Sequence, residues 1–70
     1  MTKTDEELIT LLNKIGHSDK KFVEDILFYA RTDEERQKML NLIKERNNIS
    51  RNDAIYEAFK IGAKRMGVNY

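Results

Sequence analysis

Few residues in this 70-residue chain could carry out chemistry, and none has the spacing of a catalytic or metal site. The chain has no Cys, and its one His, His17, follows Gly16 where a loop is expected. A zinc site or an activated nucleophile needs several such side chains at fixed spacing. The sequence contains no HExxH and no glycine-rich phosphate loop. We therefore expect a protein that is not an enzyme, with no catalytic residue, no metal site and no cofactor.

One short stretch, NNISRNDAI at residues 47–55, could instead hold an anion. Asn47 and Asn48 interrupt the preceding helical pattern, and Ser50 followed by Asp53 is typical of a helix start. The first amides of a helix lack partners within the helix and lie at the positive end of its dipole, so they can bind anions. The same residues also suit a simple capped turn, and both interpretations stay open.

Two helices that precede this stretch follow from capping signals and apolar spacing. Capping-box patterns at Thr4–Glu7 and Thr32–Glu35 each precede apolar residues at helical spacing. They predict helices at about 5–15 and 33–46. Gly16 suits the end of the first.

The last helix is predicted at about 51–66, with Ser50 as its cap and Gly67 at its end. Gly62 inside it costs roughly 1 kcal/mol relative to Ala, which indicates close packing or a locally weak helix. We expect Ile55 and Phe59 to face the apolar stripe of the preceding helix. The apolar face consists of Ala54, Ile55, Ala58, Phe59, Ile61 and Met66.

The segment 19–31 has two interpretations. As a helix capped by Ser18, it places five apolar residues on one face: Phe22, Val23, Ile26, Leu27 and Ala30. As a strand, the run ILFYAR has a suitable length and composition. Periodicity favours the helix, because a strand would have apolar residues on both of its faces.

Size and composition indicate one small domain of a mainly α protein. Residues 1–17 form an N-terminal helix and 18–70 the remainder, with 40% hydrophobic and 36% charged residues in the whole chain. No disulfide or zinc stabilises it, so self-association is expected to complete its core. The net charge of +1 does not by itself indicate nucleic acid. We expect a cytoplasmic protein, because neither a signal peptide nor a bilayer-spanning run is found and no membrane role is indicated.

The order of signals from Thr32 onward resembles ribbon-helix-helix DNA-binding proteins. Thr32, Asp33 and Glu34 match the join between strand and first helix in that family. The turn and second helix match at Ile49, Ser50, Asn52, Asp53, Ile55 and Ala58. The resemblance covers about residues 26–66 if ILFYAR is the strand.

The resemblance implies a small homodimeric DNA-binding regulator of transcription. The amides at Ser50, Arg51 and Asn52 would contact a DNA phosphate, and the charge of Arg51 would add to that contact. Tyr29 and Arg31 would read bases from the strand. The competing hypothesis is a four-helix module that binds a protein partner and has no nucleic-acid role.

Overall fold

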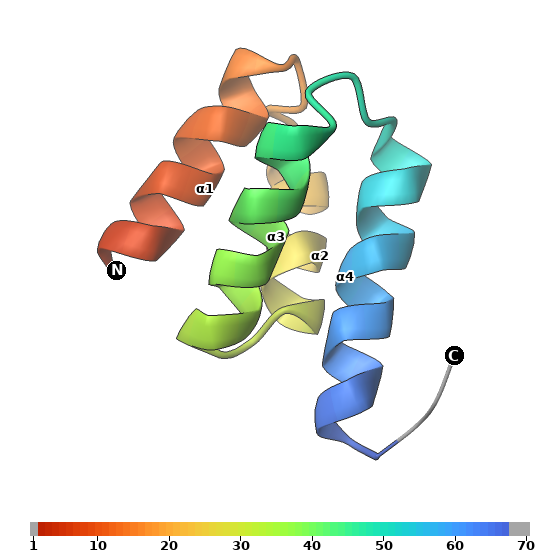
Figure 1. The fold of residues 1–70 in the computed structure, drawn as a ribbon. Coiled ribbons are helices and arrows are strands. Elements are labelled where there is room, and N and C mark those ends of the chain that lie inside the picture. The colour runs from red at the N-terminus through yellow and green to blue at the C-terminus, as the bar shows by residue number, and fades with distance from the viewer. Residues whose placement is uncertain (1, 68–70) are drawn as a thin grey trace.

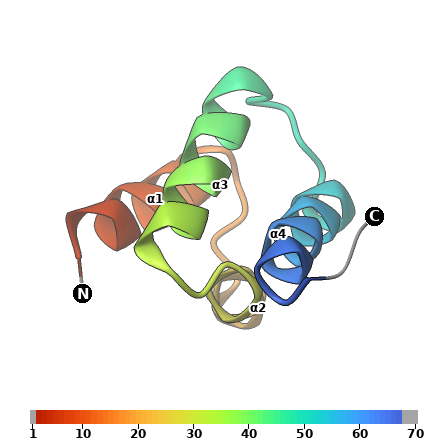
Figure 2. The same ribbon diagram turned by 60° about the horizontal axis from the view of Figure 1, so that its bottom comes forward.

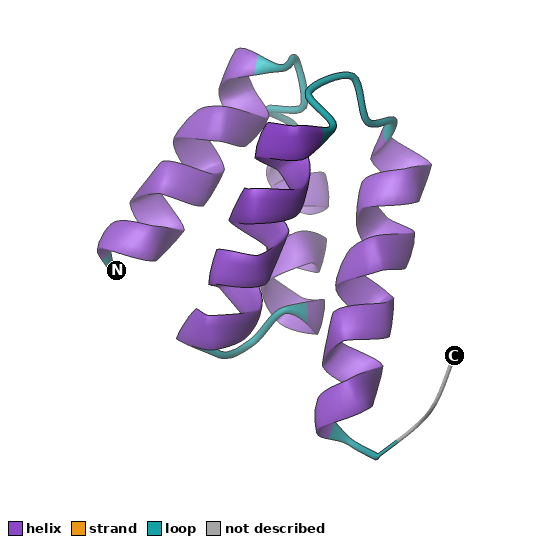
Figure 3. Ribbon diagram, in the orientation of Figure 1, coloured by secondary structure: helices purple, strands orange, loops and turns teal. Residues whose placement is uncertain are grey.

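The computed structural model describes residues 2–67, which form four α-helices joined by short connections (Figure 1). The helices are α1 (Lys3–Lys14), α2 (Lys20–Tyr29), α3 (Asp33–Glu45) and α4 (Arg51–Arg65). Figure 3 shows that helices, turns and loops account for the whole described part. The predicted mainly α fold is confirmed, and the helix ends lie within one or two residues of the expected ones.

The segment 19–31 contains a helix, and the strand alternative is not confirmed. A helix can bury Phe22, Ile26 and Ala30 together, and each of them is at most 1% exposed. Glu24 and Phe28 alternate with these residues and are exposed. A strand would place all five on the same face, because its side chains alternate with a period of two. The burial pattern therefore fits only a helical period.

Two of the predicted helix starts are confirmed by their hydrogen bonds. Thr32 and Glu35 form a reciprocal capping box at the start of α3. The Ser50 side chain caps α4 by accepting a hydrogen bond from the Asp53 N–H. The expected glycine stops also fit, since Gly16 and Gly67 follow α1 and α4 with φ of 91° and 81°.

The other two caps were assigned to the wrong residues. α1 is capped by Thr2 with Asp5, and not by the Thr4–Glu7 pair, although both pairs have the same spacing. α2 is capped by Asp19, which accepts a hydrogen bond from the Phe22 N–H at 3.2 Å, and not by Ser18. Spacing alone cannot distinguish neighbouring cap residues that are both suitable.

The helices pack in pairs around one core. α1 packs on α3, α2 packs on α4, and α3 also contacts α4. Figure 2 shows α1 and α4 on opposite sides, with α2 and α3 between them. No helix within residues 2–67 is both long enough and apolar enough to cross a bilayer. The core side chains come from all four helices and two connections: Leu8, Leu12, Phe22, Ile26, Ala30, Met39, Leu40, Ile43, Ile49, Ala54 and Ala58.

Helix α4 approaches α2 more closely than the sequence pattern suggested. Its Phe59 ring contacts the Tyr29 ring of α2, with centroids 5.6 Å apart, which the sequence pattern did not predict. Met66, expected on the buried face, is 64% exposed. The residues that α4 buries are small, including Ala58 and Gly62. A Cβ atom at Gly62 would overlap the carbonyl oxygen of Tyr29, which explains this glycine as a close-packing site.

Arg36 on α3 joins three helices. Its Nε donates to the carbonyl of Ala30 at 2.7 Å and its Nη2 to that of Leu27 at 2.8 Å, both at the C-terminal end of α2. Its Nη1 donates to the Asp5 carboxylate of α1 at 2.9 Å. The last carbonyls of a helix lack partners within the helix, so a cation there satisfies them and opposes the negative end of the dipole. Arg36 therefore fixes the end of α2 that carries Phe28.

Candidate interaction surface

The predicted phosphate site at the start of α4 has the geometry of a capped helix start. The Ser50 Oγ is 3.1 Å from the Asp53 nitrogen and accepts its hydrogen bond. The side chain of Asn52 is exposed. These contacts are those of the simple capped turn, and they leave phosphate binding at Ser50, Arg51 and Asn52 a prediction.

The Arg51 side chain interacts with two residues of α2 and its cap. Its Nη2 lies 3.0 Å from the Asp19 Oδ2, and its guanidinium carbon lies 5.1 Å from the centre of the Phe22 ring. Asp53 adds another carboxylate in the first turn of α4. Two acidic side chains therefore accompany the one arginine, which reduces its attraction for a phosphate.

The two residues predicted to read bases do not lie on a strand. Tyr29 is the last residue of α2, and Arg31 follows in the connection to α3. The Arg31 guanidinium carbon lies 5.8 Å from the centre of the Phe28 ring. The structure thus places both residues beside an exposed aromatic side chain, and the strand required for base contacts is not present within the described residues.

The strongest feature of the surface is an aromatic patch where α2 and α4 end. We define the aromatic patch as Phe28, Tyr29, Phe59 and Met66. The Phe28 and Tyr29 rings are 5.3 Å apart, and the Tyr29 and Phe59 rings are 5.6 Å apart. Together with Gly62 they border a hollow of about 150 Å³. The side-by-side course of α2 and α4 that creates it is visible in Figures 1 and 2.

The outer members of the patch are unusually exposed. Phe28 is 62% exposed and Met66 is 64% exposed. Single apolar residues on a surface are common, and Tyr56 is such a case at 55% exposed, with the Lys60 nitrogen 5.1 Å from its ring centre. Adjoining apolar side chains around a hollow are more informative, because such surfaces often bind other molecules.

Two arginines form the rim of the patch. Arg31 and Arg65 both border the hollow, and the residues described around it include no carboxylate. Arg31 forms no ion pair with any other residue in the range 2–67. The rim therefore presents two guanidinium groups beside an apolar floor, and Arg31 is the one without an ion-pair partner among the described residues.

Arg65 is held in position by the capping box of α3. Its Nε donates to the Glu35 Oε2 at 2.8 Å, while the Oε1 accepts hydrogen bonds from the N–H groups of Arg31 and Thr32. Burial alone would raise the pKa of Glu35, but the hydrogen bonds from Thr32 and Arg65 outweigh it and lower that pKa. Glu35 thus stays ionised at neutral pH and fixes one edge of the rim.

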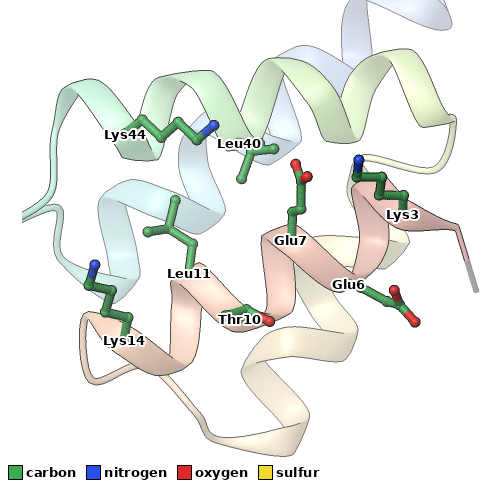
Figure 4. Close-up of a pocket in the computed structure, with 8 residues that line it drawn as sticks. All are labelled: Lys3, Glu6, Glu7, Thr10, Leu11, Lys14, Leu40 and Lys44. Carbon is green, nitrogen blue, oxygen red and sulfur yellow. The ribbon is translucent and has the colours of Figure 1, made fainter.

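A second hollow lies between α1 and α3 (Figure 4). Leu11 and Leu40 lie in its middle, Lys14 and Lys44 lie at one end, and Lys3 lies at the other. Glu6 and Glu7 also border it, so its charges are mixed. Leu40 is only 1% exposed, and the three exposed large apolar residues of the chain's described part all lie elsewhere. This groove is therefore a weaker candidate than the aromatic patch.

Sequence reasoning identified Tyr29 and Arg31 but missed Phe28, Phe59, Arg65 and Met66. A signal for Phe28 was present, because it lies outside the apolar helical face of the segment 19–31. Nothing in the spacing showed that α4 would bring Phe59 to the same place.

Within residues 2–67 no three His, Asp or Glu side chains are grouped so that they could hold a metal ion. No protein-family model, curated protein or solved structure matches the chain. Its function must therefore be inferred from its own residues.

Proposed function

We propose that this chain is a small helical protein-interaction module that binds its partner at the aromatic patch. The observation that carries the proposal is the exposure of Phe28 and Met66 beside a hollow bordered by Tyr29 and Phe59. Removing such side chains from water on binding is favourable, and aromatic and Met residues are enriched at protein interfaces.

The partner is proposed to be a helical segment of another protein. The described residues offer no sheet edge to which an extended peptide could add a strand. A helical segment satisfies its own backbone hydrogen bonds and can place apolar side chains on one face, so it suits this surface. One large apolar side chain of such a helix would enter the hollow, and its neighbours one turn away would cover Phe28 and Met66.

The DNA-binding alternative has less support in the geometry. It needs base-reading residues on a strand, and Tyr29 lies at the end of a helix. It also needs a free cation at the start of α4, and Arg51 is paired with Asp19 at 3.0 Å. We keep DNA as an outcome of the test below.

A displayed library of amphipathic helical peptides tests the proposal. Peptides selected on the unmodified chain should bind Phe28→Ser at least about tenfold more weakly, because an exposed aromatic ring that becomes buried on binding contributes a large share of the interface energy. The matched control is Tyr56→Ser, which removes an aromatic ring of similar exposure outside the patch and should leave binding unchanged.

Failure to enrich any peptide, or equal binding to Phe28→Ser, would refute the proposed surface. In parallel, an electrophoretic shift with mixed DNA at low and higher salt tests the alternative, since phosphate contacts weaken steeply with salt. A salt-sensitive shift that Arg51→Ala abolishes and Phe28→Ser leaves intact would favour the DNA-binding regulator instead.

A further inference from the structure

We infer that the segment bound at the aromatic patch is acidic, with carboxylates that flank its apolar face and pair with Arg31 and Arg65. This inference rests on the proposed function and names the chemistry of the partner. It follows from the charged side chains around the hollow.

The rim of the patch is cationic and is held in place. Arg31 lies with its guanidinium carbon 5.8 Å from the centre of the Phe28 ring, which orients the charge beside the apolar floor. Arg65 uses its Nε for Glu35, so its two Nη groups can still donate to an incoming carboxylate. Arginine at an interface suits such pairing, because its planar group binds carboxylates with two parallel hydrogen bonds.

The charges beyond the rim are mixed. Lys60 pairs with Glu57 at 3.7 Å, and Lys64 borders a neighbouring hollow together with Glu34 and Glu35. Glu35 lies 2.8 Å from Arg65, but it is buried and does not border the hollow. The preference therefore rests on Arg31, which has no ion-pair partner among residues 2–67, and on the Nη groups of Arg65. These groups attract an acidic segment and repel a basic one.

A second copy of the chain fits the patch poorly. A two-fold dimer centred on such a small patch would bring the Arg31 and Arg65 side chains of both copies together. Like charges at an interface oppose association. The two rim arginines therefore favour an acidic partner over a second copy of the chain.

A membrane surface is the other acidic target, and the shape of the patch disfavours it. The aromatic side chains border a hollow of about 150 Å³, which can take up a side chain. A flat lipid surface could cover the exposed Phe28 and Met66 but would not fill this hollow, whereas a peptide side chain can do so.

Three synthetic helical peptides test the inference. They share one apolar face of Leu and Phe at one-turn spacing, and their flanking positions are all Glu, all Gln or all Lys. Fluorescence anisotropy of labelled peptides should give the order Glu, Gln, Lys from tightest to weakest. Exposed ion pairs are individually weak, so we expect about a threefold to tenfold preference for Glu over Gln that shrinks as salt rises.

A charge reversal provides the specific control. Arg31→Glu should weaken the Glu peptide and strengthen the Lys peptide. Lys3→Glu makes the same change in charge at the start of α1, which lies outside the patch, and should alter neither affinity appreciably. Circular dichroism on both variants verifies that the helices remain.

The outcomes separate the two proposals. Equal binding of all three peptides, lost in Phe28→Ser, would overturn the acidic preference and keep the interaction module. Preference for the Lys peptide would also overturn the acidic preference. If none of the peptides binds, the interaction module itself fails. Binding to phosphatidylserine vesicles that Phe28→Ser abolishes, without peptide binding, would overturn both proposals in favour of a membrane surface.

Discussion

Gly62 shows how a single residue sets the distance between two helices. Its position opposite the Tyr29 carbonyl leaves no room for a Cβ atom. Helix α4 can therefore lie close to the end of α2, and Phe59 can reach the Tyr29 ring. The aromatic patch depends on this approach.

Gly62→Ala should destabilise the fold, although Ala is the better helix former by about 1 kcal/mol. The added methyl group would meet backbone atoms of Tyr29, which cannot move aside as a flexible side chain could. Overpacking typically costs about 1–3 kcal/mol, so we expect a net loss in the free energy of unfolding measured with urea.

Asn52→Ala, an exposed change in the same helix, serves as the control and should shift stability by no more than about 0.5 kcal/mol. A gain of about 1 kcal/mol in Gly62→Ala would show that helix propensity prevails and that α4 and α2 are farther apart.

At the scale of elements, α1 is attached to the other helices partly through a partly buried ion pair. Asp5 of α1 and Arg36 of α3 are 2.9 Å apart, with side chains 11% and 21% exposed. Burial alone would raise the pKa of Asp5, but the hydrogen bonds from Arg36 and Thr2 outweigh it and lower that pKa. The ionised carboxylate therefore stabilises the folded state.

Asp5→Asn should cost about 1–3 kcal/mol at neutral pH, since a hydrogen bond to a charged group is lost. Because the pKa of Asp5 is lower in the folded state than its ordinary value of 3.8, the carboxylate stabilises the fold at pH values above 3.8. This stabilisation is lost as the pH falls through the pKa of the folded state. The difference between Asp5→Asn and the unmodified chain should therefore shrink below about pH 3.8 in urea titrations.

Asp25→Asn is the matched control, because Asp25 pairs with Lys21 within one helix and that lysine is 77% exposed. Such helix-surface pairs contribute little to stability, because both charges stay solvated and are screened by salt. A cost as large as that of Asp5→Asn would mean that the α1–α3 pair has no special role.

The helices could be predicted because their signals are local in the sequence, whereas the contacts between helices could not. Helix periods and the caps at Thr32 and Ser50 are local, so the sequence predicted three helices and favoured the fourth. The environment of Arg51 is not local, because its partner Asp19 is 32 residues away. The same holds for the aromatic patch, which requires the pairing of α2 with α4.

At the scale of the whole molecule, the described residues bury a core without a second chain. Leu8, Ile26 and Ile43 are each 0% exposed within one chain. The homodimer predicted from the sequence rested on a small core that self-association would complete and on a ribbon strand that needs a partner. Helix α2 removes the second of these reasons. The structural reason for a dimer is therefore weaker.

We therefore expect a monomer in sedimentation equilibrium at micromolar concentration, with a thermal midpoint that does not change with concentration. The two rim arginines, Arg31 and Arg65, add a charge-based reason, because they would oppose one another in a symmetric pair formed at the aromatic patch. A chain of 70 residues buries only about 60% of its unfolded surface, so a partner could add to its stability. In an obligatory dimer, unfolding and dissociation are one event, and the thermal midpoint would rise with protein concentration. If a dimer forms, Phe28→Ser identifies its location. Loss of the dimer in this variant would mean that the aromatic patch is the self-association surface. Persistence of the dimer would place the contact on another face and leave the patch available for an acidic partner.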